Sequence, residues 1–296
     1  MKVSKDIISG WPGYRLTAGG LSIGIVPDIG GRIMSLVFRG EELLYVHASE
    51  AGKIHDFSHV ADLRTFKKEF GFRIFGGDKT WVAPEKDWWD KIPPLEIDAG
   101  RYTFEVKDNF VIMVSPVCRE TGLQITRRVS LAEDGAIHLE EEFHNTTERE
   151  IVKGIWNVTQ IKKPFDVYVP AALGDVRSYY LEDATLPEFG LVPQEKNGWV
   201  IIPCRGKVCY KIGAMLREGR SVVVKDASFA RVSWARSFDI DFARPYAHRS
   251  IIEVFNSPQY DYGEFEVHSP LYRIAPGARV SLRQCWQLAE GFGKFF

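Results

Sequence analysis

The sequence predicts an all-β protein built from two packed antiparallel sheets. Short runs of β-branched and aromatic residues alternate with polar ones along most of the 296 residues, and Gly, Pro, Asn or Asp separate the runs. Helical periodicity is scarce. Parallel βαβ units need a helix between successive strands, so hairpin signals such as VKDNF and LAEDGAI favour antiparallel pairing.

The predicted strands follow one another along almost the whole chain. They cover residues 21–27, 31–38, 101–117, 123–131, 136–145, 150–161, 198–203, 220–226, 249–257, 262–270 and 278–288. Short helices are expected only near 48–59, 85–91 and 181–188. No Pro-, Gly- or Ser-rich linker and no fixed-period repeat divides the chain, so we expect a single domain over residues 1–296.

The segment from 48 to 100 differs from the rest. Trp81, Trp88 and Trp89 stand there among charges and prolines, too polar for a core and too aromatic for an inert loop. Long irregular connections in β domains are often functional. We therefore expect this segment to form one rim of a binding site.

Charge and composition narrow the class of ligand. Lys plus Arg number 38 and Asp plus Glu number 39, so no bulk charge favours nucleic acid or an anionic membrane. No apolar stretch has the length of a signal-peptide core or a membrane span, which leads us to expect a cytoplasmic protein. The four cysteines form no CxxC pair and are expected to be reduced. A small molecule is the expected partner, and the chain is expected to be a monomer or homodimer.

The stretch YGEFEVHSP, residues 262–270, concentrates ionisable groups on one predicted strand. Successive side chains of a strand point to opposite faces. Tyr262, Glu264, Glu266 and His268 therefore share one face, which either contacts water or forms the floor of a site. The two carboxyl groups would lie roughly 5–7 Å apart, a separation that overlaps that of the acid and base of glycoside hydrolases.

Four stretches, taken in order, resemble the galactose mutarotase (aldose 1-epimerase) superfamily. They are GGRIMSLVFRGEELLYV, FRIFGGDKTWVAP, HNTTEREIVKGIWNVTQI and GEFEVHSPLYRIAPGARVSLRQCWQL. The resemblance covers nearly the whole chain, from about residue 20 to 288. The resemblance is to an uncharacterised branch, and it implies a β-supersandwich that binds sugars.

The resemblance places Glu266 where mutarotases keep the carboxylate that removes the anomeric proton. Ring opening needs such a base at O1 and an acid at the ring oxygen. The family's acid is a His on the strand that here reads Trp156 to Gln160, where no His occurs. The family's sugar-contacting His is likewise replaced, since Phe75 precedes the glycine pair. His268 is the candidate substitute acid, because its ordinary pKa suits proton transfer at neutral pH.

Further residues are candidate sugar contacts. A Trp face stacks on a pyranose, Arg and Lys donate to oxygens, and amides both donate and accept. These candidates are Arg32, Arg73, Lys79, Trp81, Asn157, Gln160, Asn256 and Tyr262. Asn157 and Gln160 differ by three positions, so only one of them is expected to face the ligand.

No cofactor or metal site is expected from sequence motifs. His55 and His59 have the i, i+4 spacing of helical metal ligands, but no third ligand lies nearby in the sequence. GGDKT lacks the phosphate-loop pattern. The favoured hypothesis is an aldose 1-epimerase-like sugar isomerase that uses a strand Glu as general base. The alternatives are a non-catalytic sugar-binding protein and a glycan hydrolase or lyase with paired carboxylates.

Overall fold

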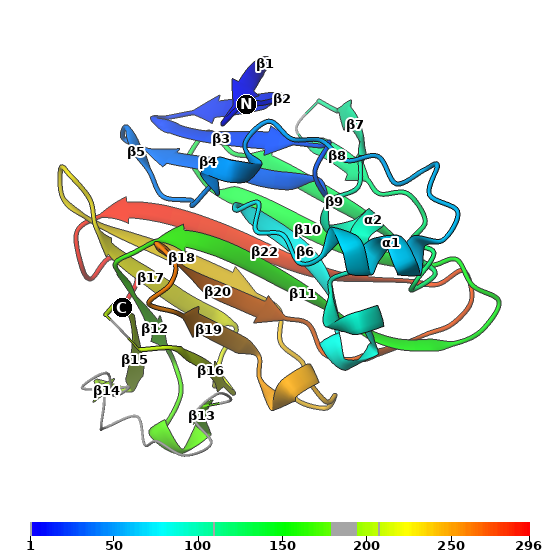
Figure 1. Ribbon diagram of the computed structural model, residues 1–296. Helices are drawn as coiled ribbons and strands as arrows, with labels where there is room; N and C mark the ends of the chain where they lie inside the picture. Colours follow the sequence, from blue (N-terminus) through cyan, green and yellow to red (C-terminus); the bar gives the residue numbers. More distant parts are fainter. Residues whose placement is uncertain (1, 109, 179–193, 207) are drawn as a thin grey trace.

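Two large antiparallel sheets, packed face to face, dominate the computed structural model, which describes residues 2–108, 110–178, 194–206 and 208–296 (Figure 1). The first sheet has the order β1-β2-β3-β4-β6-β11-β20-β19-β16-β13, with β5 beside β4 and β21 beside β11. Its strands are β1 (Lys2–Ile8), β2 (Trp11–Ala18), β3 (Leu21–Val26), β4 (Arg32–Phe38), β5 (Glu41–Glu42), β6 (Asp78–Ala83), β11 (Ile151–Lys162), β13 (Val176–Ser178), β16 (Tyr210–Ala214), β19 (Ile252–Asn256), β20 (Tyr262–His268) and β21 (Tyr272–Ile274).

The second sheet has the order β14-β15-β12-β17-β18-β22-β10-β9-β8-β7. Its strands are β7 (Thr103–Val106), β8 (Val111–Val114), β9 (Leu123–Leu131), β10 (Ile137–Asn145), β12 (Phe165–Val169), β14 (Gln194–Lys196), β15 (Trp199–Cys204), β17 (Arg220–Asp226), β18 (Arg231–Phe238) and β22 (Arg279–Glu290). The prediction of an all-β fold with two antiparallel sheets is confirmed.

Helices are few and short. Those among the described residues are η1 (Ala48–Glu50), α1 (Leu63–Phe70), η2 (Glu85–Asp87), η3 (Trp89–Lys91), α2 (Leu95–Asp98), η4 (Leu173–Asp175) and η6 (Ala247–Arg249). The predicted helix near 48–59 is reduced to the single turn η1, and that near 85–91 appears as η2 and η3. The predicted helix at 181–188 lies outside the described residues. Asp62 caps α1 by accepting a hydrogen bond from the Thr65 amide at 3.0 Å.

The expected irregular segment 48–100 in fact contributes a central strand. β6 lies between β4 and β11, and all six of its residues are buried. Its charged residues Asp78 and Lys79 weakened the strand signal in the sequence. The hairpin of β1 and β2 is also additional to the prediction, because its polar residues and internal Gly and Pro obscure the alternation.

The space between the sheets holds the main apolar core and, within it, a buried ionic network. On β11, Ile155 and Ile161 face this interior together with Asn157. Asn157 donates to Asp78 Oδ2 and to Glu141 Oε1, both at 3.0 Å. Burial of charge is tolerated here because each carboxylate has several donors.

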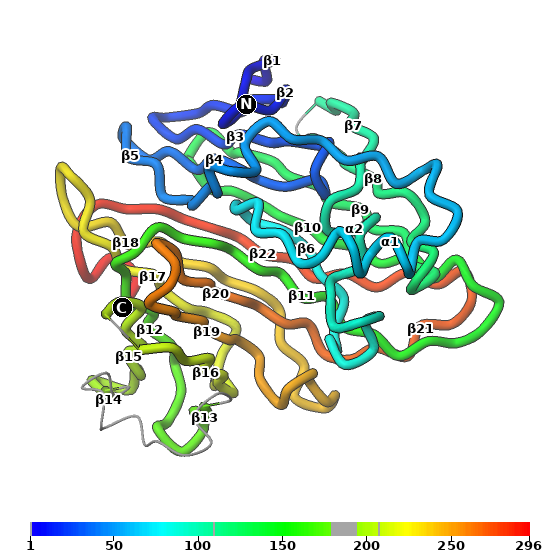
Figure 2. Tube along the Cα trace, viewed as in Figure 1, coloured from blue at the N-terminus to red at the C-terminus, as the bar shows by residue number. Residues whose placement is uncertain are grey.

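The connections are arranged unevenly around the sheets. Figure 2 shows the 239–251 connection, in gold, reaching the end of β20 that lies near the 84–94 segment. Within the described part of the chain, no helix is both long and apolar enough to cross a membrane.

Candidate functional site

Three neighbouring strands of the first sheet present polar side chains on its outer face. β11 pairs with β20 so that Gln160 lies opposite Glu264, and Trp156 opposite His268. Directly opposed residues of an antiparallel pair point to the same face. β6 extends this face, because Trp81 lies opposite Trp156.

This face forms the floor of a hollow of about 260 Å³. Its lining is Phe72, Trp81, Glu85, Trp88, Lys91, Pro93, Trp156, Lys211, Phe255, Tyr260, Tyr262 and Glu264. Pockets for drug-sized ligands begin at roughly 300 Å³, so this hollow has the size for a single small ring. We call it the groove.

A larger hollow, of about 740 Å³, lies against the β1–β2 hairpin. Its two carboxylates are already paired, Asp6 with Arg15 at 2.5 Å and Asp28 with Arg101 at 3.0 Å. The groove instead combines carboxylates, ammonium groups and aromatic faces on adjacent strands. We therefore take the groove as the candidate site.

Aromatic rings form one wall of the groove. Trp88 stacks on Trp156, with ring centroids 5.6 Å apart and planes 23° apart, and Trp81 meets both rings edge-on. The Trp88 Nε1 group donates to the Val82 carbonyl at 2.7 Å, which fixes the loop that carries it. The wall offers flat apolar surface beside polar groups.

Glu264 is the carboxylate on the strand floor of the groove, and Glu85 of η2 also lines the hollow. Glu264 accepts a hydrogen bond from Gln160 Nε2 at 2.7 Å and lies 3.6 Å from Lys79 Nζ. The Lys79 ammonium group lies 4.3 Å from the Trp81 ring centroid. Burial lowers the pKa of Lys79, because desolvation disfavours its charged form.

Glu266 lies deeper, fully buried beneath Trp156. Its Oε2 atom accepts from Trp156 Nε1 at 2.7 Å and lies 3.1 Å from Lys211 Nζ. The same ammonium group lies 2.9 Å from Glu253 Oε2 on the neighbouring strand. One lysine therefore bridges two buried carboxylates.

The pKa values of Glu266 and Glu253 are shifted in opposite directions from the ordinary value. Burial, and then the negative charges of Glu253 and Glu264, raise the pKa of Glu266 well above its ordinary value despite Lys211. Burial would also raise the pKa of Glu253, but Lys211 and His268 hold it well below the ordinary range. Lys211 has a pKa well above its ordinary value, since both carboxylates outweigh its burial. Of the two carboxylates, Glu266 therefore holds a proton in preference to Glu253.

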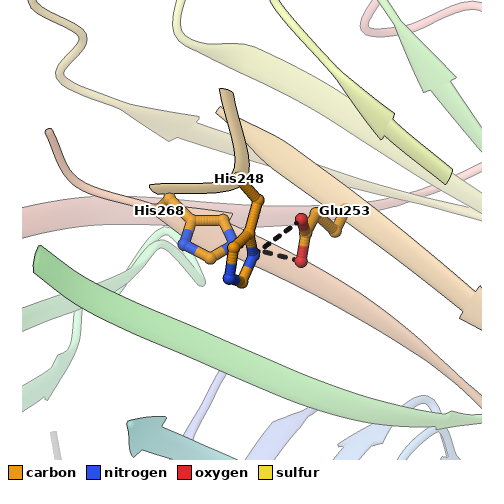
Figure 3. A group of neighbouring side chains, drawn as sticks. All are labelled: His248, Glu253 and His268. Atoms are coloured by element: carbon orange, nitrogen blue, oxygen red, sulfur yellow. Dashed lines mark hydrogen bonds and ion pairs between the residues drawn. The ribbon is translucent and has the colours of Figure 1, made fainter. Parts of the chain in front are cut away.

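Two imidazoles flank Glu253 (Figure 3). His248 Nδ1 lies 3.0 Å from one carboxylate oxygen, and His268 Nε2 lies 3.3 Å from the other. The His268 ring also stacks on Trp156, with centroids 5.1 Å apart. Burial lowers the pKa of His268.

The structure brings seven of the predicted residues to this face of the sheet. They are Lys79, Trp81, Gln160, Tyr262, Glu264, Glu266 and His268. The expectation that only one of Asn157 and Gln160 faces outward matches the register, and Gln160 is that residue.

The other four predicted residues lie elsewhere. Asn157 faces the interior between the sheets, and Asn256 donates to the Val208 carbonyl at 2.7 Å. Arg32 is buried and pairs with Asp98 at 2.6 Å. Arg73 pairs with Glu50 at 3.3 Å. Their side chains are engaged in holding neighbouring segments together, so we do not place them in the groove.

Several residues of the site are not among those predicted from the sequence. They are Trp156, Lys211, His248 and Glu253. Glu253 had a signal, because IIEVF places a lone acid among apolar residues of a predicted strand. His248 had none, since it precedes that strand in an irregular segment.

Comparisons with known proteins agree with the fold. The family model described as "Domain of unknown function (DUF4380)" matches residues 14–289. A search of curated proteins gave no match. Many solved structures are similar, although with low sequence identity.

Three of these structures illustrate the likeness. A putative aldose 1-epimerase from Escherichia coli K12 has a TM-score of 0.58 at 10% identity, covering 98% of this chain and 100% of that one. A galactose mutarotase-like protein from Lactobacillus casei ATCC 334 has a TM-score of 0.58 at 10% identity, covering 93% and 99%. A galactose 1-epimerase from Lactobacillus acidophilus NCFM has a TM-score of 0.52 at 9% identity, covering 98% and 99%. The mutarotase-like fold is thereby confirmed, and the likeness concerns the fold alone.

Proposed function

The chain belongs to the DUF4380 family and has a galactose mutarotase-like fold, and from this premise we propose that it binds a small carbohydrate in the groove and acts on it as an aldose 1-epimerase-like isomerase. The observation that carries the proposal is the convergence of carboxylate, ammonium and indole groups on a hollow of about 260 Å³. Sugars need all three, because their hydroxyls donate and accept while one ring face is apolar.

Anomer exchange needs a proton acceptor at O1 and a donor at the ring oxygen. Glu266 is the base that the family resemblance favours, whereas Glu264 is the strand carboxylate on the floor of the groove. We propose that Glu264 contacts the sugar directly and is the general base. Glu266 lies beneath the sugar and contributes by holding the ammonium group of Lys211, 3.1 Å away. Lys79 and Lys211 are the donors closest to these carboxylates.

A second candidate is a sugar-binding protein without catalysis. It is favoured by the full burial of Glu266 and by the absence of a His between 156 and 160. The third hypothesis, a glycan hydrolase or lyase, fits less well, because a hollow for one ring does not accommodate a polymer.

The first experiment is a thermal-shift screen of monosaccharides, sugar phosphates and uronic acids against the full chain. A ligand that binds the folded state raises its melting temperature as RT ln(1 + [L]/Kd). Anomer exchange of each stabilising sugar is then followed by polarimetry. No shift with any sugar would contradict the binding proposal, and binding without exchange faster than in buffer would support the second candidate.

Matched variants assign the roles of the carboxylates. We expect Glu264→Gln to reduce the exchange rate by about 100-fold or more, which is the usual contribution of a general base. Glu266→Gln should reduce it as well, and Glu140→Gln, a half-buried site on the other sheet, should leave it unchanged. Loss of exchange in Glu266→Gln alone would return the role of base to Glu266.

A further inference from the structure

The cluster of His248, Glu253 and His268 lies beside the groove but does not line it. The proposed sugar chemistry uses Lys79 and Lys211 as donors, in place of the candidate acid His268, and leaves these three residues without a proton transfer. We propose that these three side chains form a binding site for one divalent transition-metal ion of the zinc type. Two imidazole nitrogens and one carboxylate are a ligand set found in zinc sites that keep an open coordination position. Nitrogen-rich sets of this kind also select against Mg²⁺ and Ca²⁺, which prefer oxygen ligands.

The ligand atoms are close enough for one ion to contact all three. One ligand atom from each residue lies within 4.8 Å of the others, and the two imidazole nitrogens lie 3.0 and 3.3 Å from the carboxylate oxygens. In a tetrahedral site with bonds of about 2.0–2.1 Å, ligand atoms are about 3.3 Å apart. Figure 3 shows both rings directed at the same carboxylate. Small side-chain rotations therefore suffice to close the site.

Three separate elements deliver these ligands. Glu253 stands on β19 and His268 at the end of β20, both fully buried, and His248 comes from the turn η6. The two strand positions are held by the sheet, and this gives the site a rigid base. The His248 side chain is 20% exposed, which leaves a path for an ion to enter.

Backbone and hydrogen-bond features of the cluster point to a ligand. His248 has φ 54°, a left-handed conformation that few residues with a side chain adopt, and the turn uses it to hold the ring against Glu253. In the described part of the chain, His268 Nε2 and Glu253 Oε2 face each other at 3.3 Å, and both atoms are buried without a hydrogen-bond partner. Backbone strain and unsatisfied buried polar atoms both cost stability, and an ion bound between these atoms would offset that cost.

Lys211 is the competitor for this site. Its ammonium group lies 2.9 Å from Glu253 Oε2 and supplies a positive charge to the same carboxylate. If Lys211 is the native cation, Glu253 pairs with the lysine and with both rings. If a metal ion is the native occupant, it shares Glu253 with Lys211 by using the oxygen that faces His248.

The test is calorimetric titration of ZnCl₂ into the full chain after treatment with a chelator, without sugar. We expect one zinc ion per chain, and Co²⁺ should give the visible absorption of a site with nitrogen ligands. His268→Ala should weaken zinc binding by about tenfold or more, because loss of even a supporting partner costs metal sites 10–100-fold. His248→Asn should do the same, and Asn tolerates the left-handed backbone. The exposed His138→Ala is the control and should bind as wild type does.

The outcomes of the titration distinguish a bound metal ion from Lys211 as the native cation beside Glu253. One zinc per chain, weakened by both site variants and not by the control, supports the metal site. No stoichiometric binding by wild type overturns it, as does binding that both site variants retain. Binding seen only in Lys211→Met also overturns it, because the native protein then uses lysine as its cation. The wild-type titration decides the matter even if a variant fails to fold, and it does not depend on the proposed sugar chemistry.

Discussion

Both faces of the β6–β11–β20 region bury charged groups, but the hydrogen bonding of the buried carboxylates differs between the two faces. The inner face holds the network of Asp78, Glu141, Arg127 and Arg236 between the sheets, and the outer face holds the groove cluster of Glu253, Glu264, Glu266, Lys79 and Lys211. In the inner network every carboxylate oxygen accepts a hydrogen bond. Within the described residues, the Nε groups of Arg127 and Arg236 lack a hydrogen-bond partner there, but no carboxylate oxygen of the network does. That face holds the two sheets together.

The groove cluster leaves buried polar atoms without partners. Within the described residues, Glu266 Oε1 and Gln160 Oε1 make no hydrogen bond. A buried polar atom without a partner costs stability unless a ligand or water completes it. The difference teaches that burial of charge alone does not mark a site, whereas buried oxygen atoms that still lack a hydrogen-bond donor and lie beside a hollow do.

The largest expected effect is on the inner face. Arg127→Met removes a buried guanidinium group that pairs with Asp78 and lies 3.6 Å from Glu141. We expect the free energy of unfolding to fall by about 3–5 kcal/mol, because two buried carboxylates lose their main cation. Urea denaturation of wild type and variant measures this change in the free energy of unfolding.

Arg283→Met is the matched control on the same sheet. Arg283 is 69% exposed and pairs with Glu140 at 2.9 Å. Exposed pairs contribute about 0–1 kcal/mol, so this variant should unfold almost as wild type does. Equal losses for the two arginines would show that the inner network does not hold the sheets together.

The next effect compares two buried tryptophans. Trp156→Phe removes the indole donor to Glu266, whereas Trp234→Phe removes an indole nitrogen that has no hydrogen-bond partner in the described structure. Both rings are 1% exposed, so the loss of packing is similar. We expect Trp156→Phe to be less stable than Trp234→Phe by about 1–3 kcal/mol, the cost of a lost bond to a buried acceptor. Thermal and urea unfolding of both variants measure the difference, and equal stabilities would contradict it.

Much of this architecture can be predicted from the sequence, because the alternation of side chains along a strand is a local pattern. The alternation in residues 262–270 correctly placed Glu264, Glu266 and His268 on one face. The three-residue offset likewise separated Asn157 from Gln160. These inferences need only the period of a strand.

Other parts of the site depend on pairing between distant strands. Lys211 meets Glu266 only because β16 and β20 both flank β19, and His248 reaches Glu253 through a left-handed turn. No local pattern encodes either contact. Arg32 and Asn256 were candidate sugar contacts, but the structure shows them in internal contacts instead. The sequence does not distinguish these two roles, because the same residue types suit both.

The smallest effect is a dependence on pH in the groove. Burial lowers the pKa of Lys79, so between that lowered pKa and the ordinary value near 10.5 the unfolded chain binds more protons than the folded one. The free energy of unfolding should therefore rise with pH across this window through Lys79, by up to about 1.4 kcal/mol for each unit of lowering. Lys79→Met abolishes this contribution. Wild type should thus gain stability relative to the variant as the pH rises through this window towards 10.5.

Urea unfolding at several pH values, without ligand, checks this dependence, and Lys5→Met at an exposed position of β1 is the control. The wild-type advantage over Lys5→Met is the reference, because Lys5 is exposed and lies outside the groove. A constant advantage over Lys79→Met would mean that Glu264, 3.6 Å away, fully compensates the burial of Lys79. The groove would then resemble the inner network, and the contrast between the two faces would rest on Glu266 and Gln160 alone.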